Sequence, residues 1–250
     1  MKDVVINRDG NHWETLRRCN GYYCCPNADG IWQGPLVGYA GKYQDADGTE
    51  KQWVGHEYAN FAKTDEHPRV MQHFCHYMAD CLTEEDLKQV DFLCGMPIGG
   101  YNFSYQLGLT FDRQVIKAEK KVIALATPTS REKTTLFFGR HSIEPGARYA
   151  IAEDVCNNFS TTEDGIATIQ SAGGKVTMIV CLLNRSLNWP HEYHSETLHK
   201  AIPVKSLVRK VIEEYKQDDP VVAEDVKKGN VVWKPKDNWD FLMEQMGKSH

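Results

Sequence analysis

The segment from Ala147 to Arg185 constrains the fold of this chain more than any other. It reads ARYAIAEDVCNNFSTTEDGIATIQSAGGKVTMIVCLLNR. An apolar run of strand length ends in two acids, and a polar loop and an amphipathic helix follow. Gly173 and Gly174 then end the helix before a second apolar strand. This order predicts a crossover between parallel strands, which puts the polar loop at the carboxyl edge of the sheet.

Further apolar runs at VDFLCG and KKVIAL also have strand length, and segments of helical pattern lie between several of the runs. Such alternation predicts an α/β fold with a central parallel sheet that helices cover on both faces. Upstream, GPLVGYAGKY and KQWVGHEYANF flank the turn signal DADG and predict a small sheet. Residues 68–82 predict a helix, and Thr83 is the expected N-cap of the next one.

These patterns divide the chain into three expected parts. Residues 1–85 form a small N-terminal subdomain with a lead-in helix, and residues 86–200 form the α/β core. The text after Trp189 and Pro190 is charged and irregular, so residues 201–250 are expected to be a C-terminal extension packed on the core.

Composition narrows the class of protein. With 250 residues, of which 41% are hydrophobic, the chain is long enough for a core. The 29 Lys and Arg against 34 Asp and Glu give a net charge of -5, which disfavours a nucleic-acid partner. The longest apolar run, Met178 to Leu183, is far shorter than the roughly 20 residues that span a bilayer. The start MKDVVINRDG has no apolar signal segment. We therefore expect a cytoplasmic protein with no membrane partner.

The eight cysteines are not expected to form a disulfide framework, because a chain of this length has room for a core. Cys19, Cys24 and Cys25 are expected to be structural thiols. Cys19, Cys24 and Cys25 do not have the spacing of a four-ligand zinc site. His73 and His76 have the spacing of two ligands on one helix face. The surrounding pattern favours a packed amphipathic helix instead.

The loop after the acid pair has the chemistry of a sugar-phosphate site. Backbone amides at the start of a helix, with the helix dipole, favour a phosphate. The hydroxyls of Ser160, Thr161 and Thr162 can add hydrogen bonds to its oxygens. Glu153 and Asp154 suit the vicinal hydroxyls of a sugar or a divalent cation. The pattern is thus consistent with a ribose 5-phosphate site, or with an ordinary loop that caps a helix.

The stretch EDVCNNFSTT resembles the phosphoribosyl-pyrophosphate signature of type I phosphoribosyltransferases. FLCGMPIGGYNFSYQLGL is similar to the pyrophosphate loop of that family, and AEKK at 118–121 also matches. GPLVGYAGKY with the later EHP matches the order of the small hood subdomain in orotate phosphoribosyltransferases. The resemblance implies a type I phosphoribosyltransferase fold with an N-terminal hood. In the phosphate loop the chain departs from the usual Thr-Thr-Gly-Gly, since it has Asn157, Asn158, Phe159 and Ser160.

The resemblance implies transfer of ribose 5-phosphate from phosphoribosyl pyrophosphate to a nucleobase in a homodimer, with Mg²⁺ bridging the substrate oxygens. Glu153 and Asp154 would hold the ribose hydroxyls, and residues 157–162 the 5-phosphate. Gly99 and Gly100 would offer backbone amides to pyrophosphate. A hairpin at residues 127–133 would close over the site. The implied cations are Lys120, Lys121, Arg131, Lys133 and Arg140.

The order of the motifs favours orotate as the base. Tyr39 or Lys42 in the hood could contact its carboxylate, and Tyr58 or Phe61 could stack on the ring. The alternatives are the same reaction on a purine, nicotinamide or another pyrimidine, and a non-catalytic regulator that binds phosphoribosyl pyrophosphate or a nucleotide.

Overall fold

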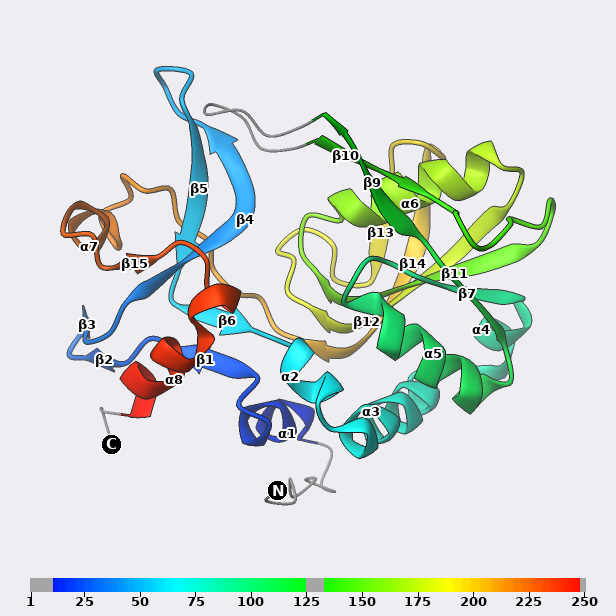
Figure 1. Cartoon of the computed structure of the whole chain (residues 1–250), viewed down its shortest axis with the longest axis horizontal. Helices are drawn as coiled ribbons and strands as arrows, with labels where there is room; N and C mark the ends of the chain where they lie inside the picture. Colours follow the sequence, from blue (N-terminus) through cyan, green and yellow to red (C-terminus); the bar gives the residue numbers. More distant parts are fainter. Residues whose placement is uncertain (1–10, 125–132, 248–250) are drawn as a thin grey trace. The chain divides into compact units, whose positions relative to one another are not determined.

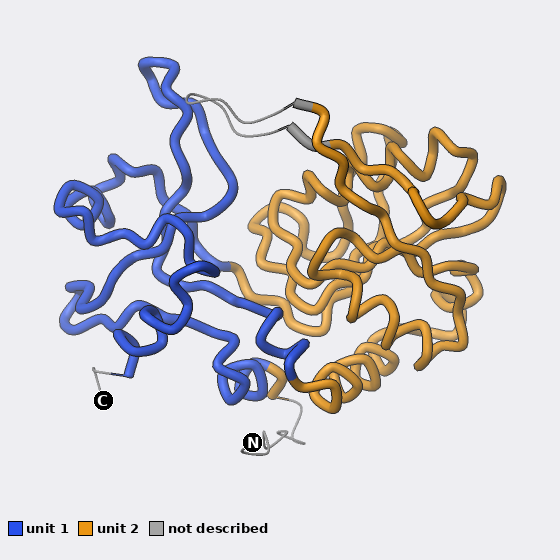
Figure 2. Tube along the Cα trace, in the orientation of Figure 1, with its two compact units in different colours: residues 1–5, 13–66, 212–250 blue, residues 6–12, 67–211 orange. Residues whose placement is uncertain are grey.

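A computed structural model describes residues 11–124 and 133–247, which fold into helices and into parallel and antiparallel strands (Figure 1). The chain forms two compact units (Figure 2). Unit 1 consists of residues 1–5, 13–66 and 212–250, and unit 2 of residues 6–12 and 67–211. In the described residues, no helix is both long and apolar enough to cross a membrane.

Unit 2 is built on a six-stranded sheet in the order β13-β14-β12-β11-β7-β8. Neighbouring strands from β14 to β8 are parallel, and β13 pairs antiparallel with β14 at one edge. This arrangement confirms the predicted α/β fold with a mostly parallel central sheet. The strands are β7 (Phe92–Gly95), β8 (Gln114–Lys117), β11 (Arg148–Cys156), β12 (Lys175–Asn184), β13 (Glu192–Ser195) and β14 (Lys200–Arg209).

Helices cover both faces of this sheet (Figure 1). On one face α5 (Gly100–Phe111) packs on β7 and β11, and α3 (Pro68–Asp80) packs on α5. On the other face α6 (Ser160–Ser171) packs on β11 and β12. The predicted helix at 68–82 is confirmed. Thr83 is the N-cap of α4 (Glu84–Lys88), as predicted, because its side chain accepts a hydrogen bond from the amide of Asp86.

The run KKVIAL is not a strand of the central sheet, so that expectation is wrong. It lies mostly in β9 (Glu119–Ala124), which pairs only with β10 (Lys133–Phe137) in an antiparallel ladder. Val122 and Ile123 remain 43% and 61% exposed, because the ladder is not covered on both faces. The expected hairpin at 127–133 lies outside the described residues except for Lys133, which begins β10.

Unit 1 contains the predicted small sheet. Strands β4 (Leu36–Gln44) and β5 (Glu50–Gly55) pair antiparallel around the DADG turn, where Gly48 takes a φ of +81°. Strand β15 (Val231–Val232) extends this sheet along β4. The remaining elements are α1 (His12–Arg18), β1 (Tyr22–Cys24), β2 (Asn27–Ala28), β3 (Ile31–Trp32), β6 (Glu57–Ala59), α2 (Ala62–Asp65), α7 (Ala223–Lys227), the 3-10 helix η1 (Lys236–Asn238) and α8 (Trp239–Gly247).

The C-terminal residues do not form the extension on the core that the sequence suggested. Strand β14, at 200–209, lies inside the core sheet, and residues 212–250 belong to unit 1. Val231 pairs with Leu36, and Trp239 Nε1 donates to the carbonyl of Asn20 at 2.7 Å. The described C-terminal segment therefore completes the packing of the N-terminal unit.

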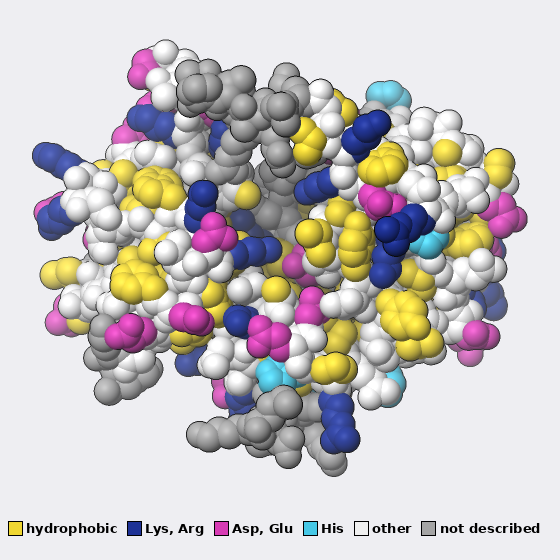
Figure 3. Space-filling view, viewed as in Figure 1, with side chains coloured by type: hydrophobic (Ala, Val, Ile, Leu, Met, Phe, Trp, Pro, Cys, Tyr) yellow, Lys and Arg dark blue, Asp and Glu magenta, His cyan; other side chains and the backbone are white. Residues whose placement is uncertain are grey.

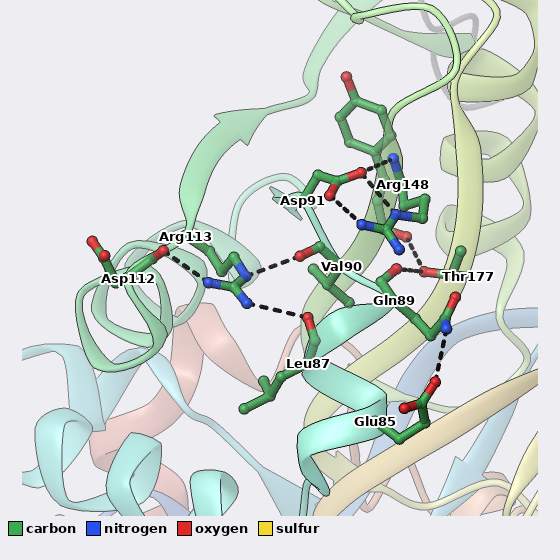
Figure 4. A network of polar contacts seen from close by, with 10 residues as sticks. Glu85, Leu87, Gln89, Val90, Asp91, Asp112, Arg113, Arg148 and Thr177 are labelled. Atoms are coloured by element: carbon green, nitrogen blue, oxygen red, sulfur yellow. Dashed lines mark hydrogen bonds and ion pairs between the residues drawn. The ribbon is translucent and has the colours of Figure 1, made fainter.

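A polar network ties together the amino ends of the central strands (Figure 4). Asp91 Oδ1 accepts from Arg148 Nη2 at 2.6 Å, and Asp91 Oδ2 accepts from Arg148 Nε at 2.9 Å. Arg113 donates to the carbonyls of Val90 at 2.9 Å and Leu87 at 3.3 Å. These side chains fix the edge of the sheet at which β7 and β11 begin. The carboxyl edge, where ligands bind in open α/β sheets, carries a different set of residues.

Side chains of both charges are interspersed over the visible face of the described residues (Figure 3). No patch of a single charge marks a site on the part of this face that the structure describes.

Candidate functional site

Two loops meet at the carboxyl edge of the sheet. The first joins β7 to α5 and contains Gly99, and the second joins β11 to α6. Strands β7 and β11 are neighbours, with Gly95 paired to Ala152. A Cβ built on Gly99 would lie 2.2 Å from Cγ of Asp154, and one on Gly100 would lie 2.1 Å from the carbonyl oxygen of Ala152. Only glycine allows this approach, so the structure brings the predicted Gly99, Gly100 and Asp154 together.

The two acids differ in environment. Asp154 is half-buried, and its Oδ1 accepts the amide hydrogen of Val155 at 2.8 Å. Glu153 is only 8% exposed. Burial, together with the neighbouring charge of Asp154, raises the pKa of Glu153 well above its ordinary value. Asp154 is thus the more accessible of the pair for a ligand, while Glu153 is the harder to ionise.

Lys120, one of the predicted cations, lies within electrostatic range of Glu153. It is exposed on β9, and its charge acts to lower the pKa of Glu153 and of Asp164 in α6, although burial raises both. Lys121 is also exposed on β9 and pairs in register with Thr135. Arg131 lies outside the described residues, and the side chain of Lys133 is likewise not described. The roles expected of those two residues stay predictions.

The loop before α6 forms a compact turn. Asn158 Oδ1 accepts from the amide of Ser160 at 3.2 Å and from its hydroxyl at 3.1 Å. Ser160 is exposed and Thr161 is half-buried, whereas Thr162 is only 1% exposed. The hydroxyls of Ser160 and Thr161 are therefore better placed to reach a ligand than that of Thr162. Asn157 is half-buried beside them.

Phe159 has a left-handed backbone conformation, and its side chain is buried in the protein. It has φ 58° and ψ 17°, the left-handed conformation for which glycine is favoured. Its ring is 3% exposed and lies in a buried cluster with Cys156 and Ile166. Any contact of Phe159 with a ligand must therefore come mainly from its backbone. The ring stacks on Tyr193 of β13. The sequence does not predict this contact, because the residues around β13 have no regular apolar pattern.

Comparison with known sequences bears on this site. No family model matches the chain. Orotate phosphoribosyltransferase of Bartonella tribocorum is 23% identical over 159 residues, which cover 64% of this chain and 71% of that protein. The chain is thus similar in sequence to a phosphoribosyltransferase over 159 of its residues. This similarity confirms the predicted resemblance to the type I phosphoribosyltransferases.

Solved structures of type I phosphoribosyltransferases are similar at lower identity. The orotate phosphoribosyltransferase of Aeropyrum pernix is 11% identical with a TM-score of 0.48, covering 79% of this chain and 93% of that one. The adenine phosphoribosyltransferase of Thermoanaerobacter pseudethanolicus is 13% identical with a TM-score of 0.47, covering 62% and 89%.

Arg140, which the type I phosphoribosyltransferase resemblance suggested for the site, lies elsewhere in unit 2. It lines a hollow of about 550 Å³ with residues of α5 and β8, among them Tyr105, Leu109 and Lys117. None of the described residues lining that hollow belongs to the acid pair or to the loop before α6. The structure therefore does not bring Arg140 together with the phosphate loop.

The residues expected to contact the base lie in unit 1, where each of them contacts or is buried among other residues of that unit. The hydroxyl of Tyr39 donates to the carbonyl of Glu57 at 2.6 Å, and Lys42 forms an ion pair with Glu50. Tyr58 stacks on Tyr39 with ring centroids 6.2 Å apart, and Phe61 is buried. Their contact with a base stays a prediction.

The residues of the histidine and cysteine clusters are also of types that can bind a metal ion. His73 packs its ring against His12 and Tyr77, while His76 is exposed. Within residues 11–124 and 133–247, no three His, Cys, Asp or Glu side chains are grouped so as to hold a metal ion. All eight cysteines lie in these ranges, and none takes part in a disulfide. The packed-helix interpretation of residues 73–81 thus agrees with the structure.

Proposed function

We propose that this chain is a phosphoribosyltransferase that moves ribose 5-phosphate from phosphoribosyl pyrophosphate to a nucleobase. The observation that carries the proposal is the fit of Gly99 and Gly100 against the end of β11, where Asp154 precedes the loop into α6. Similarity to the orotate phosphoribosyltransferase of Bartonella tribocorum supports it.

The sugar and its phosphate would bind at the end of β11. The half-buried Asp154 can accept hydrogen bonds from the ribose hydroxyls, and charge-assisted bonds of this kind are the stronger ones. The first turn of α6 offers backbone amides and the positive end of the helix dipole to the 5-phosphate. The exposed hydroxyl of Ser160 donates to Asn158 Oδ1 at 3.1 Å, so it can add a further hydrogen bond to the phosphate only by exchanging that partner. These groups bind and orient the donor.

Pyrophosphate would leave on the side of the β7–α5 loop. In the reaction the bond from ribose C1 to a pyrophosphate oxygen breaks, and the oxygen takes the bonding electron pair. A ring nitrogen of the base forms the new bond to C1, and its proton passes to solvent unless the nitrogen is already ionised. The amide of Gly99 can stabilise the charge that develops on pyrophosphate. The amide of Gly100, which was also expected to do so, instead donates to the carbonyl of Met96 at 3.0 Å. Lys120, whose charge acts on Glu153, can add a positive charge near the acid pair.

One protein carboxylate in the site could serve as a ligand of Mg²⁺. Mg²⁺ prefers oxygen ligands and usually keeps several waters, so one protein carboxylate beside the substrate's own oxygens is sufficient. Asp154 is the accessible carboxylate here, since Glu153 is buried and resists ionisation. Bound Mg²⁺ would supply charge neutralisation for the pyrophosphate oxygens.

We propose orotate as the base because the similar protein of Bartonella tribocorum is an orotate phosphoribosyltransferase. Adenine is the main alternative, since similar solved structures include adenine phosphoribosyltransferases. A non-catalytic regulator that binds phosphoribosyl pyrophosphate is a second candidate. It is favoured by Asn158, whose side chain already accepts from the Ser160 amide that a phosphate would use.

The test is a two-step assay on the full chain. Calorimetry with phosphoribosyl pyrophosphate and Mg²⁺ measures binding of the donor. Release of pyrophosphate is then measured with orotate, adenine, hypoxanthine, nicotinamide and uracil in turn. Release with orotate alone supports the proposal in full, and release with another base corrects the acceptor. Binding without release supports the regulator, and neither binding nor release overturns the proposal.

A further inference from the structure

Phe159 has a backbone conformation that its own side chain disfavours. Its φ of 58° lies in the left-handed region, where a bulky L-residue is uncommon. The residue sits directly before Ser160, the first residue of α6, so this conformation turns the chain from β11 into the helix. Other parts of the structure must therefore stabilise the turn.

Tyr193, on β13, contacts the ring of Phe159. The rings of Phe159 and Tyr193 are stacked, with centroids 4.7 Å apart and planes inclined by 9°. Phe159 is 3% exposed and Tyr193 is 7% exposed, so the stack is shielded from water. Such pairs contribute beyond their burial, and rotation of Phe159 out of the left-handed conformation would break this one.

Tyr193 is itself held in place. It pairs in register with Ile202 of β14, and Trp189 meets its ring edge-on at 5.4 Å. The strand that carries Tyr193 is also joined to the first turn of α6. Glu163 Oε1 accepts from Ser195 Oγ at 3.1 Å and from the Thr197 amide at 2.7 Å. Phe159 is thus fixed between β13 and the helix that it begins.

We propose that Tyr193 is a positioning residue for the phosphate loop. Its ring holds Phe159 in the left-handed conformation, and this sets the direction in which the first amides of α6 face a phosphate. The inference rests on the proposed function, because it assumes that the phosphate binds there. The stack would do for this chain what glycine does where it occupies the corresponding position in the loop.

The test compares removal of this stack with removal of a similar one elsewhere. Tyr193→Met keeps a large apolar side chain but removes the ring, and Tyr193→Phe keeps the ring. The control is Phe92→Leu, which removes the buried stack of Phe92 on Tyr149. Those rings lie 5.0 Å apart at 18° and at the amino end of the strands. Phe159→Gly removes the need for the stack, because glycine adopts the left-handed conformation readily.

Binding of phosphoribosyl pyrophosphate and the KM for it are the first measurements. We expect Tyr193→Met to weaken binding about five- to tenfold, the equivalent of one aromatic pair, with a smaller change in kcat. Phe92→Leu should stay within about twofold of the wild type. Tyr193→Phe keeps the ring but loses the hydrogen bond of the hydroxyl to Glu163, so it should lose less than Tyr193→Met. In the Phe159→Gly background, Tyr193→Met should have little further effect. Equal losses in Tyr193→Met and Phe92→Leu, or additive losses in the double variant, would overturn the inference.

Hydrogen exchange separates this inference from the proposed function. Amides of residues 156–162 should exchange faster in Tyr193→Met than in Phe92→Leu, whether or not a ligand binds. If the wild type binds no phosphoribosyl pyrophosphate, the proposed function fails and exchange alone tests the stack. Unchanged exchange in that segment would overturn the positioning role. If Tyr193→Met does not fold, Phe159→Leu removes the same stack from the other side and is expected to show the same changes.

Discussion

Gly99 and Asp154 lie so close that a single added carbon would collide: a Cβ at position 99 would be 2.2 Å from both Cγ and Oδ2 of the Asp154 carboxylate. This contact joins the β7–α5 loop to the end of β11. The position of the carboxylate and the identity of the glycine therefore depend on each other.

Gly99→Ala is expected to disturb the site more than the fold. The new methyl group must displace the Asp154 carboxylate or move the loop, because real Cβ atoms essentially never lie closer than 3.0 Å to another heavy atom. We expect kcat/KM to fall by on the order of a hundredfold, measured as pyrophosphate release. Gly247→Ala is the matched control, since nothing lies within 4 Å of its built Cβ. Equal activity of the two variants would contradict the role of Gly99.

Asp154→Asn should weaken binding or turnover with little effect on folding. The substitution keeps the shape of the side chain but removes the charge that would accept hydrogen bonds from the ribose. Loss of one such electrostatic contact costs on the order of a hundredfold in rate. Calorimetry and thermal unfolding should be measured together, with the exposed Asp80→Asn as control. Full activity in Asp154→Asn would show that the carboxylate does not contact the substrate.

Sequence patterns could predict the central elements because their periodicity is strong. The apolar runs of β7, β11 and β12 are buried on both faces along most of their length. Gly173, which follows the end of α6, has a φ of +88°. The acid pair and its loop followed from the same segment. Strand β14 was missed because it combines lysines with Pro203 and is only partly buried.

Other features depend on contacts between distant residues, which periodicity does not encode. KKVIAL has the composition of a core strand, but Ile116 of β8, not Ile123, occupies the buried position at the sheet edge. Phe159 takes a left-handed conformation, and its ring stacks on Tyr193, a residue far away in the sequence. Arg140 was assigned by its place in the sequence after the hairpin, and the fold carries it to the hollow beside α5.

Asp91→Asn should reduce stability without affecting the candidate site. Hydrogen bonds from the side chain and amide of Arg148 lower the pKa of Asp91 to about 2, from an ordinary 3.8. A lowered pKa in the folded state means that this stabilisation is present above pH 3.8 and is lost as the pH falls through about 2. The side chains are 38% and 39% exposed, so solvent screening limits the expected loss to about 1 kcal/mol or less. Urea unfolding at pH 7 and pH 2 measures it. The difference between variant and wild type should shrink at pH 2, and a constant difference would contradict the ionic contribution.

Glu153→Gln is expected to stabilise the protein at neutral pH. Burial and the charge of Asp154 raise the pKa of Glu153 in the folded state above the 4.5 of an ordinary glutamate. The contribution of Glu153 to stability is therefore fully present below pH 4.5 and is lost as the pH rises through the folded-state pKa. A neutral side chain of the same shape avoids this loss, so the free energy of unfolding should rise by about 1 to 3 kcal/mol at pH 7. At pH 4 the gain should be smaller. Urea unfolding at both pH values measures the effect, with the exposed Glu144→Gln as control. A gain that is equal at pH 4 and pH 7, or a net loss at pH 7, would show that Glu153 is not held as a neutral acid.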